Sequence, residues 1–258
     1  MTVHAVAAFQ DNYIWLIQSA QSQQVLIVDP GDAGPVLKAL AQFNLSPAAI
    51  LITHHHQDHT GGINALCQQF NLPVYGPADE NIQGISQSLT AGETININAH
   101  FPTLRVLDTG GHTPGHISYL MDDQLFCGDT LFAGGCGRLL GGTAAQLFAS
   151  LQQIAELPGT TEIFCAHEYT LANLQFALTV EPDNADLQQR FADSQTMRAK
   201  QQPTVPSVLS LEKATNPFLR CDVPAVRRAA EQQAGQSLDN PLAVFKVLRQ
   251  WKDNFKAA

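Results

Sequence analysis

The ten residues Thr53–Gly62, THHHQDHTGG, directly follow the apolar run 48–52 and contain four histidines and one aspartate. A short apolar run with branched side chains predicts a buried β-strand, so the polar cluster would lie where that strand ends. So many desolvated imidazole groups would be costly without a cation to bind. This stretch therefore predicts a metal site at the end of a core strand.

The first 170 residues or so alternate short β-rich runs with helical patterns, which is typical of an α/β or α+β sheet protein. The predicted strands are NYIWLIQ, QVLIVDP, AAILITH, PVYGP, TLRVLDT, HISYLM, QLFCGD and EIFCAH. Apolar residues at helical spacing predict helices over 33–43, 61–70 and 143–157, the last with Thr143 as its N-cap.

From about Thr170 the β-rich runs stop. The rest of the chain is helical in pattern, interrupted by a proline-containing stretch over 201–220. We expect two domains, residues 1–172 and residues 173–258.

Three other metal-capable residues, His112, Asp129 and His167, follow further predicted strands. Because functional groups in layered α/β proteins lie on loops at strand ends, we expect these ends to converge on one site. Imidazole and carboxylate without thiolate suit Zn²⁺, Fe²⁺ or Mn²⁺. Two ions that share a bridging carboxylate would use all the candidates, which are too many for one four-coordinate ion: His54, His56, Asp58, His59, His112, Asp129 and His167.

Composition and charge exclude some classes of site and of function. The five cysteines form no C-x-x-C pair, which argues against a disulfide framework and a thiolate zinc site. Residues 1–189 carry 17 acidic and three basic side chains, whereas residues 190–258 carry six acidic and 11 basic ones. This asymmetry indicates metal-seeking groups in the first part and an anion-binding surface in the second, unless the late charges only solvate helix faces. With no apolar run of bilayer length and no signal-peptide pattern, we expect a cytoplasmic protein that binds neither membrane nor nucleic acid.

The pattern T-H-x-H-x-D-H, followed by an isolated His, an Asp after CG and a final His, resembles the metallo-β-lactamase superfamily. DNYIWLI, IVDPGD, GHTPGHISY, LFCGDTLFAGGCGR, CAHEYT and NPFLR extend the resemblance nearly from end to end, to the glyoxalase II family of hydroxyacylglutathione hydrolases. The resemblance implies an α/β (α+β) fold, namely a four-layer αβ/βα sandwich with a C-terminal helical domain.

The resemblance also implies two divalent metal ions per chain, zinc first, with iron or manganese as alternatives. The first would be held by His54, His56 and His112, the second by Asp58, His59 and His167, and Asp129 would lie between them. His55 and Gln57 fall on variable positions, and His116 is expected to be structural. Asp58 has a second possible duty as the catalytic residue that orients the attacking hydroxide.

Such a site suits thioester hydrolysis. Two cations lower the pKa of a bridging water from about 16 towards neutrality, and the leaving thiolate, with a conjugate-acid pKa of about 8.5, needs no general acid. The resemblance implies hydrolysis of S-(2-hydroxyacyl)glutathione, chiefly S-D-lactoylglutathione, to glutathione and D-lactate. A monomer is the default expectation and does not follow from the resemblance.

The resemblance assigns the glutathione moiety to Arg138, Tyr169, Arg249 and Lys252. Arg249 and Lys252 share one helix face through their i, i+3 spacing. Leu140 stands where some family members carry an aromatic residue, so we expect either weaker binding of glutathione or contacts from the backbone amides of the glycine-rich loop instead.

Several alternatives stay open at this point. A persulfide dioxygenase of this fold would use a single iron, and a β-lactamase would normally be exported. A nuclease would need a basic surface, whereas the site-bearing region here is acidic. A metal-dependent binding protein without turnover is disfavoured, because structural zinc closes its shell with four ligands.

Overall fold

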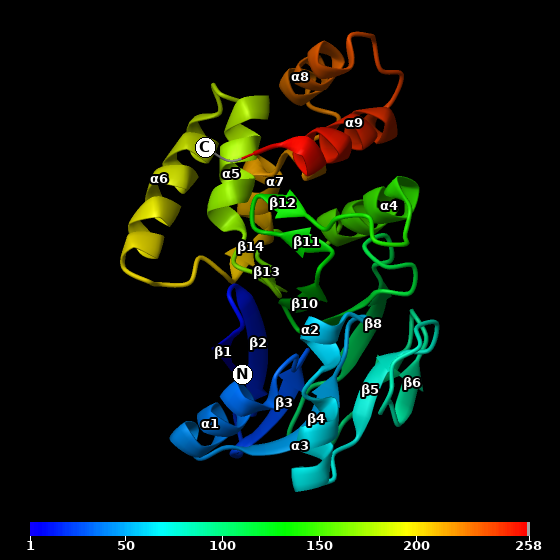
Figure 1. Ribbon diagram of the computed structural model, residues 1–258, viewed down its shortest axis with the longest axis vertical. Helices are drawn as coiled ribbons and strands as arrows, with labels where there is room; N and C mark the ends of the chain where they lie inside the picture. Colours follow the sequence, from blue (N-terminus) through cyan, green and yellow to red (C-terminus); the bar gives the residue numbers. More distant parts are fainter. Residues whose placement is uncertain (257–258) are drawn as a thin grey trace. The chain divides into compact units, whose positions relative to one another are not determined.

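The computed structural model describes residues 1–256 and forms two compact units. Unit 1 comprises Met1–Thr109 and Pro114–Gly128, and unit 2 comprises Gly110–Thr113 together with the chain from Asp129 onward. Figure 1 shows sheets and short helices in the first unit and mostly helices in the second.

Unit 1 contains a six-stranded sheet in the order β1-β2-β3-β4-β5-β6. Its strands are β1 (Thr2–Ala8), β2 (Asn12–Gln18), β3 (Gln24–Val28), β4 (Ser46–Leu51), β5 (Val74–Pro77) and β6 (Gln87–Leu89). The first three strands are antiparallel and the last four, β3 to β6, are parallel. Parallel neighbours need crossover connections, and two of these contain α1 (Ala33–Phe43) and α3 (Ile63–Phe70).

Helices α1 and α3 cover one face of this sheet. The Asp32 side chain accepts a hydrogen bond from the Gly34 amide and caps the start of α1. Val36 of α1 and Leu66 of α3 pack with Ile27 and Ile50 in one buried cluster. The intervening residues of these strands are buried as well, so both faces of the sheet are covered.

Four antiparallel strands of unit 1 follow in the order β10-β9-β8-β7. They are β7 (Thr94–Ile95), β8 (Leu104–Asp108), β9 (Ile117–Met121) and β10 (Gln124–Gly128). The Tyr119 hydroxyl donates to the Ile52 carbonyl at 2.7 Å, and the Ile117 amide donates to the Thr53 carbonyl at 3.0 Å. Strand β9 therefore fixes the chain just beyond β4, where the histidine-rich stretch begins.

Unit 2 contains the hairpin β11 (Leu131–Phe132) and β12 (Gly135–Cys136), and the antiparallel pair β13 (Glu162–Cys165) and β14 (Ser207–Val208). Its helices are α4 (Ala144–Ala155), α5 (Thr170–Val180), α6 (Ala185–Ala199), α7 (Leu209–Thr215), α8 (Pro224–Ala234) and α9 (Pro241–Asn254), with the 3₁₀ turn η1 (Pro217–Leu219). Rings of α5, η1 and α9 form an aromatic core, with Phe218 at 6.0 Å from Phe176 and 5.7 Å from Phe245.

The predicted elements are largely confirmed. All eight predicted strands are present, and Thr143 caps α4 in a reciprocal capping box with Gln146. The prediction missed β1, which has seven residues. It also missed the very short strands β6, β7, β11, β12 and β14, because two or three residues carry too little periodicity. Within residues 1–256, no helix combines the length and apolar character required to cross a membrane.

Candidate active site

Asp29, at the end of β3, anchors the histidine-rich stretch of unit 1. Its buried carboxylate accepts hydrogen bonds from the amide and hydroxyl of Thr53 at 2.8 and 2.7 Å. The same group lies 3.0 Å from Nδ1 of His59. With Nδ1 directed at the carboxylate, Nε2 is the ring nitrogen of His59 that can ligate a metal.

His54 and His56, in the segment just before helix α2 (Gln57–Thr60), point ring nitrogens at each other. Nε2 of His54 lies 2.9 Å from Nδ1 of His56. The ring of His116 stacks on His54 at 4.8 Å, and its Nδ1 lies 3.0 Å from the Thr109 hydroxyl. His116 therefore packs on the His54 ring and is itself held by Thr109, and its structural role remains a prediction.

Asp58 and His59 both lie in the short helix α2. The side-chain amide of Asn12, at the start of β2, donates to Oδ2 of Asp58 at 2.9 Å. A Cβ atom at Gly31 would lie 1.8 Å from the Asp58 carbonyl oxygen, so only glycine lets the loop after β3 pass this close to α2. Local backbone packing and Asn12 together fix Asp58.

The ring of His55 packs edge-on against His56 at 4.8 Å, but its polar contacts are with Glu80. Its Nδ1 is 2.7 Å from Glu80, and its backbone amide donates to the same carboxylate at 2.6 Å. Both His55 and Gln57 are exposed. That neither residue ligates a metal remains a prediction.

Three candidate ligands of unit 2 meet around Asp129, the residue that follows β10. Oδ2 of Asp129 lies 3.4 Å from Nε2 of His112, and Oδ1 lies 3.3 Å from Nε2 of His167. Nδ1 of His112 donates to the Arg138 carbonyl at 2.7 Å, so its Nε2 is the nitrogen that can ligate. A buried carboxylate that offers one oxygen to each of two imidazoles has the arrangement of a bridging ligand.

Both units supply donor atoms that suit divalent metal ions. Unit 1 supplies His54, His56, Asp58 and His59, and unit 2 supplies His112, Asp129 and His167. These are imidazole nitrogens and carboxylate oxygens without a thiolate, with ring orientations held by Asp29 and a backbone carbonyl.

Cys136 and Cys165 do not compete as nucleophiles. Burial raises the pKa of the Cys136 thiol to about 11, although the neighbouring Arg249 opposes the shift. Burial likewise raises the pKa of the Cys165 thiol to about 12. Both are protonated thiols at neutral pH, whereas the reactive form is the thiolate.

Tyr169 immediately precedes α5 and lies against a candidate ligand. Its ring stacks on His167 with a centroid distance of 4.7 Å and an interplanar angle of 4°. The ring of Phe132 packs edge-on against both at 5.9 and 5.3 Å. Because Tyr169 is 38% exposed, its hydroxyl can reach solute while its ring steadies His167.

Arg249, on α9, is 4% exposed and fully engaged by the protein at its Nη atoms. Nη1 donates to the carbonyls of Cys136 and Gly137 at 2.9 and 3.3 Å, and Nη2 donates to Asp253 at 2.9 Å. The guanidinium also lies 5.2 Å from the ring centroid of Phe218. Arg249 thus holds the segment after β12 against α9.

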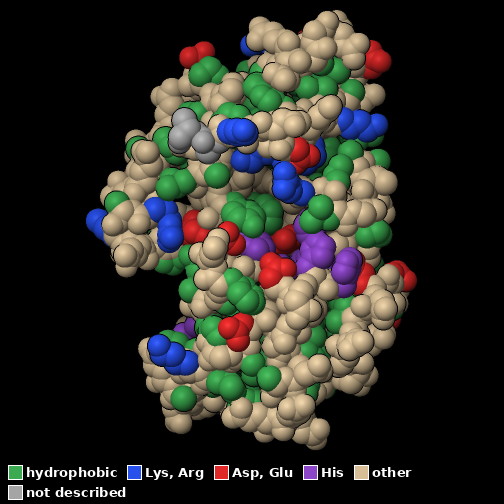
Figure 2. All heavy atoms as spheres, in the orientation of Figure 1, with side chains coloured by type: hydrophobic (Ala, Val, Ile, Leu, Met, Phe, Trp, Pro, Cys, Tyr) green, Lys and Arg blue, Asp and Glu red, His purple; other side chains and the backbone are tan. Residues whose placement is uncertain are grey.

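Arg138 and Lys252 are the more accessible cations. On the face drawn in Figure 2, Lys and Arg side chains lie over the helices of unit 2. Nζ of Lys252 donates to the Ala172 carbonyl at 3.0 Å and lies over the Phe176 ring. Partial burial, followed by the nearby charge of Arg249, lowers the pKa of Lys252 to about 8.

Leu140 is exposed, and its backbone amide donates to the His112 carbonyl at 2.8 Å. A Cβ atom at Gly137 would lie 2.0 Å from the Asp129 carbonyl oxygen. The glycine-containing segment after β12 therefore packs directly on two candidate ligands, whichever side chain stands at position 140.

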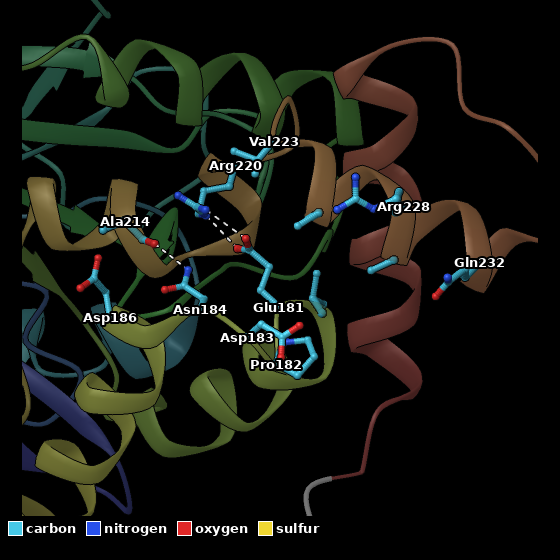
Figure 3. Close-up of a pocket in the computed structure, with 13 residues that line it drawn as sticks. Glu181, Pro182, Asp183, Asn184, Asp186, Ala214, Arg220, Val223, Arg228 and Gln232 are labelled. Atoms are coloured by element: carbon cyan, nitrogen blue, oxygen red, sulfur yellow. Dashed lines mark hydrogen bonds and ion pairs between the residues drawn. The ribbon is translucent and has the colours of Figure 1, made fainter.

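A groove of about 610 Å³ in unit 2 contains none of the predicted site residues. Figure 3 shows its wall, where Arg220 donates to Glu181 at 2.8 and 3.0 Å and Asn184 donates to the Ala214 carbonyl at 3.0 Å. These contacts tie α5 and the start of α6 to α7 and η1. They account for the polar lining of the groove without assigning it a ligand.

Two family models match successive parts of the chain. The metallo-beta-lactamase superfamily model matches residues 9–86 and 88–167, and the model of the hydroxyacylglutathione hydrolase C-terminus matches residues 168–255. A hydroxyacylglutathione hydrolase from Nitrosomonas eutropha is 52% identical over 98% of this chain and 99% of its own length. The chain belongs to the hydroxyacylglutathione hydrolase family.

Solved structures confirm the fold of this family member. ETHE1 from Myxococcus xanthus aligns with a TM-score of 0.69 over 99% of this chain and 92% of its own, at 22% identity. TTHA1623 in a di-iron-bound form aligns with a TM-score of 0.53 over 65% of this chain and 92% of its own, at 30% identity. The chain therefore has the metallo-β-lactamase fold, with a C-terminal helical region.

Sequence reasoning missed the residues that hold the ligands of this hydroxyacylglutathione hydrolase family member. Asp29 and Asn12 contact candidate ligands that are distant in sequence, and Glu80 holds His55, which lies outside the candidate set. Asp29 and Asn12 stand inside the quoted motifs IVDPGD and DNYIWLI, and a polar residue at the end of a buried strand was the available signal. Asp253 was missed because nothing in the local pattern links it to Arg138.

Proposed function

We propose that this chain is a thioester hydrolase that cleaves S-(2-hydroxyacyl)glutathione, chiefly S-D-lactoylglutathione, to glutathione and D-lactate, the second step of methylglyoxal detoxification. The observation that carries the proposal is the match to a hydroxyacylglutathione hydrolase at 52% identity over nearly the whole chain. The fold alone would not suffice, because one fold hosts many chemistries. The match to the family's C-terminal model at residues 168–255 points to the same substrate.

The proposed cofactor is a pair of divalent ions, with zinc first and iron or manganese as alternatives. We assign His54, His56 and His112 to one ion, Asp58, His59 and His167 to the other, and Asp129 to both. The ring orientations within each unit and the position of Asp129 between two imidazoles support this assignment, as does the di-iron-bound form of one structural relative. When bound, such ions lower the pKa of water and polarise the acyl carbonyl.

Asp58 is the proposed catalytic residue besides its role as a ligand. Asn12 fixes its Oδ2, which leaves the carboxylate directed for a hydrogen bond from the attacking water. The leaving thiolate of glutathione, with a conjugate-acid pKa of about 8.5, departs without a general acid.

Arg138, Tyr169, Arg249 and Lys252 are the proposed glutathione-binding residues. Glutathione is anionic, and these residues bring three cations to a chain with a net charge of −9. We propose that residues 1–172 form the catalytic domain and residues 173–258 form a helical substrate-binding domain. We further propose a cytoplasmic monomer without nucleic-acid or membrane partners.

The test is thiol release from S-D-lactoylglutathione by metal-loaded protein. The proposal predicts stoichiometric glutathione and D-lactate with no consumption of oxygen. Oxygen uptake with glutathione persulfide by a protein that holds one iron, together with no release of thiol from the thioester, would instead identify the dioxygenase alternative.

A further inference from the structure

A charged cluster of four residues lies in unit 2, where the segment after β12 meets the last turns of α9: Arg138, Arg249, Lys252 and Asp253. Oδ1 of Asp253 lies 2.9 Å from Nη2 of Arg249 and 3.4 Å from Nε of Arg138. A single carboxylate oxygen therefore serves two of the three cations assigned above to glutathione.

The two arginines depend on Asp253 to different extents. Arg249 is buried, and its Nη1 donates to the carbonyls of Cys136 and Gly137, so it keeps its place through contacts other than Asp253. The Arg138 side chain is 65% exposed, and Asp253 is its charged partner at a long 3.4 Å. Exposed pairs of this kind are weak and exchange readily.

Asp253 is itself accessible to solute, with 36% of its side chain exposed. A carboxylate of a bound peptide would approach the same cations that Asp253 neutralises. It would also meet the negative charge of Asp253 at close range, and like charges oppose each other most where water is partly excluded.

We propose that Asp253 is a specificity-determining residue, an internal counter-ion that occupies Arg138 and Arg249 until a carboxylate of the glutathione moiety replaces it. The inference rests on the proposed glutathione-binding function of these cations. It assigns Asp253 the role of limiting affinity for the anionic thiol product, so that glutathione leaves after hydrolysis.

Asp253→Asn removes the negative charge of this side chain and nearly preserves its shape. Asparagine has nearly the same volume and keeps a side-chain oxygen that can accept the Arg249 hydrogen bond. Asp193→Asn is the matched control: Asp193 is an exposed residue of α6 whose contact is Gln189, and its replacement changes the net charge equally.

Calorimetric titration with glutathione at pH 6.5, with wild type and both variants, tests the proposal. This pH lies well below the pKa of Lys252, about 8, so loss of the neighbouring carboxylate does not discharge the lysine. We expect Asp253→Asn to bind glutathione about threefold to tenfold more tightly, the range expected for partly exposed charges, and Asp193→Asn to match wild type.

A second ligand identifies the group that competes. The monoethyl ester of glutathione lacks the glycine carboxylate, and we expect its affinity to change less than that of glutathione when Asp253 is replaced. Unchanged or weaker glutathione binding by the variant would overturn the proposal, whereas equal gains for both ligands would identify the γ-glutamyl carboxylate as the group that competes. If Asp253→Asn folds poorly, Asp253→Ser gives the same readout.

Kinetics separate this inference from the proposed function. In Asp253→Asn we expect KM for the thioester to fall and product inhibition by glutathione to strengthen. Wild-type protein that hydrolyses the thioester, beside a variant with unchanged KM and glutathione affinity, refutes the role of Asp253 alone. Wild-type protein without thiol release refutes the proposed function.

Discussion

Nδ1 of His59 lies 3.0 Å from Oδ2 of Asp29, and both side chains are buried in unit 1. The same carboxylate accepts two hydrogen bonds from Thr53, so it joins the end of β3 to the chain after β4. A carboxylate that holds Nδ1 fixes the tautomer and direction of an imidazole and raises its basicity as a ligand.

Replacement of Asp29 by Asn should therefore weaken metal binding without removing a ligand. We expect a loss of about 10- to 100-fold in affinity, the range typical of groups that orient metal-bound histidines. Competition with a chromophoric chelator measures it. Asp123→Asn, at an exposed turn, provides the control, and equal affinities of the two variants would show that Asp29 does not orient a ligand.

Deprotonation of Lys252 should weaken substrate binding at alkaline pH. Burial and the charge of Arg249 lower its pKa to about 8; the charge of Arg138 acts the same way, while Cys136 and Asp253 oppose them. Below that pH the ammonium attracts the anionic thioester, and above it the charge is lost, so KM should rise as pH increases through about 8. A bound anion stabilises the protonated form and moves the transition upward in the complex.

Lys252→Arg is the matched variant for the pH experiment, because arginine stays charged throughout this range. Its KM should be nearly independent of pH from 7 to 9. A rise in KM identical to that of wild type would assign the alkaline limb to another group.

Tyr169 should contribute to the site in two separable ways. Tyr169→Phe keeps the ring stacked on His167 but loses the hydroxyl, and we expect KM to rise about threefold to tenfold, as for the loss of one hydrogen bond, with unchanged metal content. Tyr169→Ala should also lower metal content, because His167 loses its stacking partner. Elemental analysis beside steady-state kinetics separates the two effects, and equal metal content in both variants would refute the stacking role.

The buried ion pair between Arg190 and Glu212 should contribute strongly to the free energy of unfolding of unit 2. Glu212 accepts hydrogen bonds from Arg190, Ser207, Asn216 and the Gly134 amide, and it is fully buried. Arg190→Leu leaves this carboxylate without its cation, and we expect a loss of about 3–5 kcal/mol in the free energy of unfolding. Denaturant unfolding measures it.

The control for this prediction is a surface pair. Arg227 and Glu231 on α8 are separated by 3.8 Å and are partly exposed. Arg227→Leu also removes a hydrogen bond to the Leu238 carbonyl at 2.7 Å, and it should cost about 1–2 kcal/mol. Similar losses for the two variants would mean that the buried pair has no special role in stability.

Much of the candidate site could be predicted from local sequence patterns. The cluster at 54–59 is dense enough to indicate a metal by itself, and apolar periodicity placed α1 and α4 correctly. Spacing also placed Arg249 and Lys252 on one face of α9. It could not reveal that Arg249 is buried against the carbonyls of Cys136 and Gly137, because those contacts join residues more than 100 positions apart.

The most direct test of the two-ion hydrolase is the rate of thiol release from S-D-lactoylglutathione while metal-free protein is titrated with Zn²⁺. We expect the rate to rise until two equivalents are bound per chain and then to level off. A rate that levels off at one equivalent, or no thiol release at two, would contradict the account.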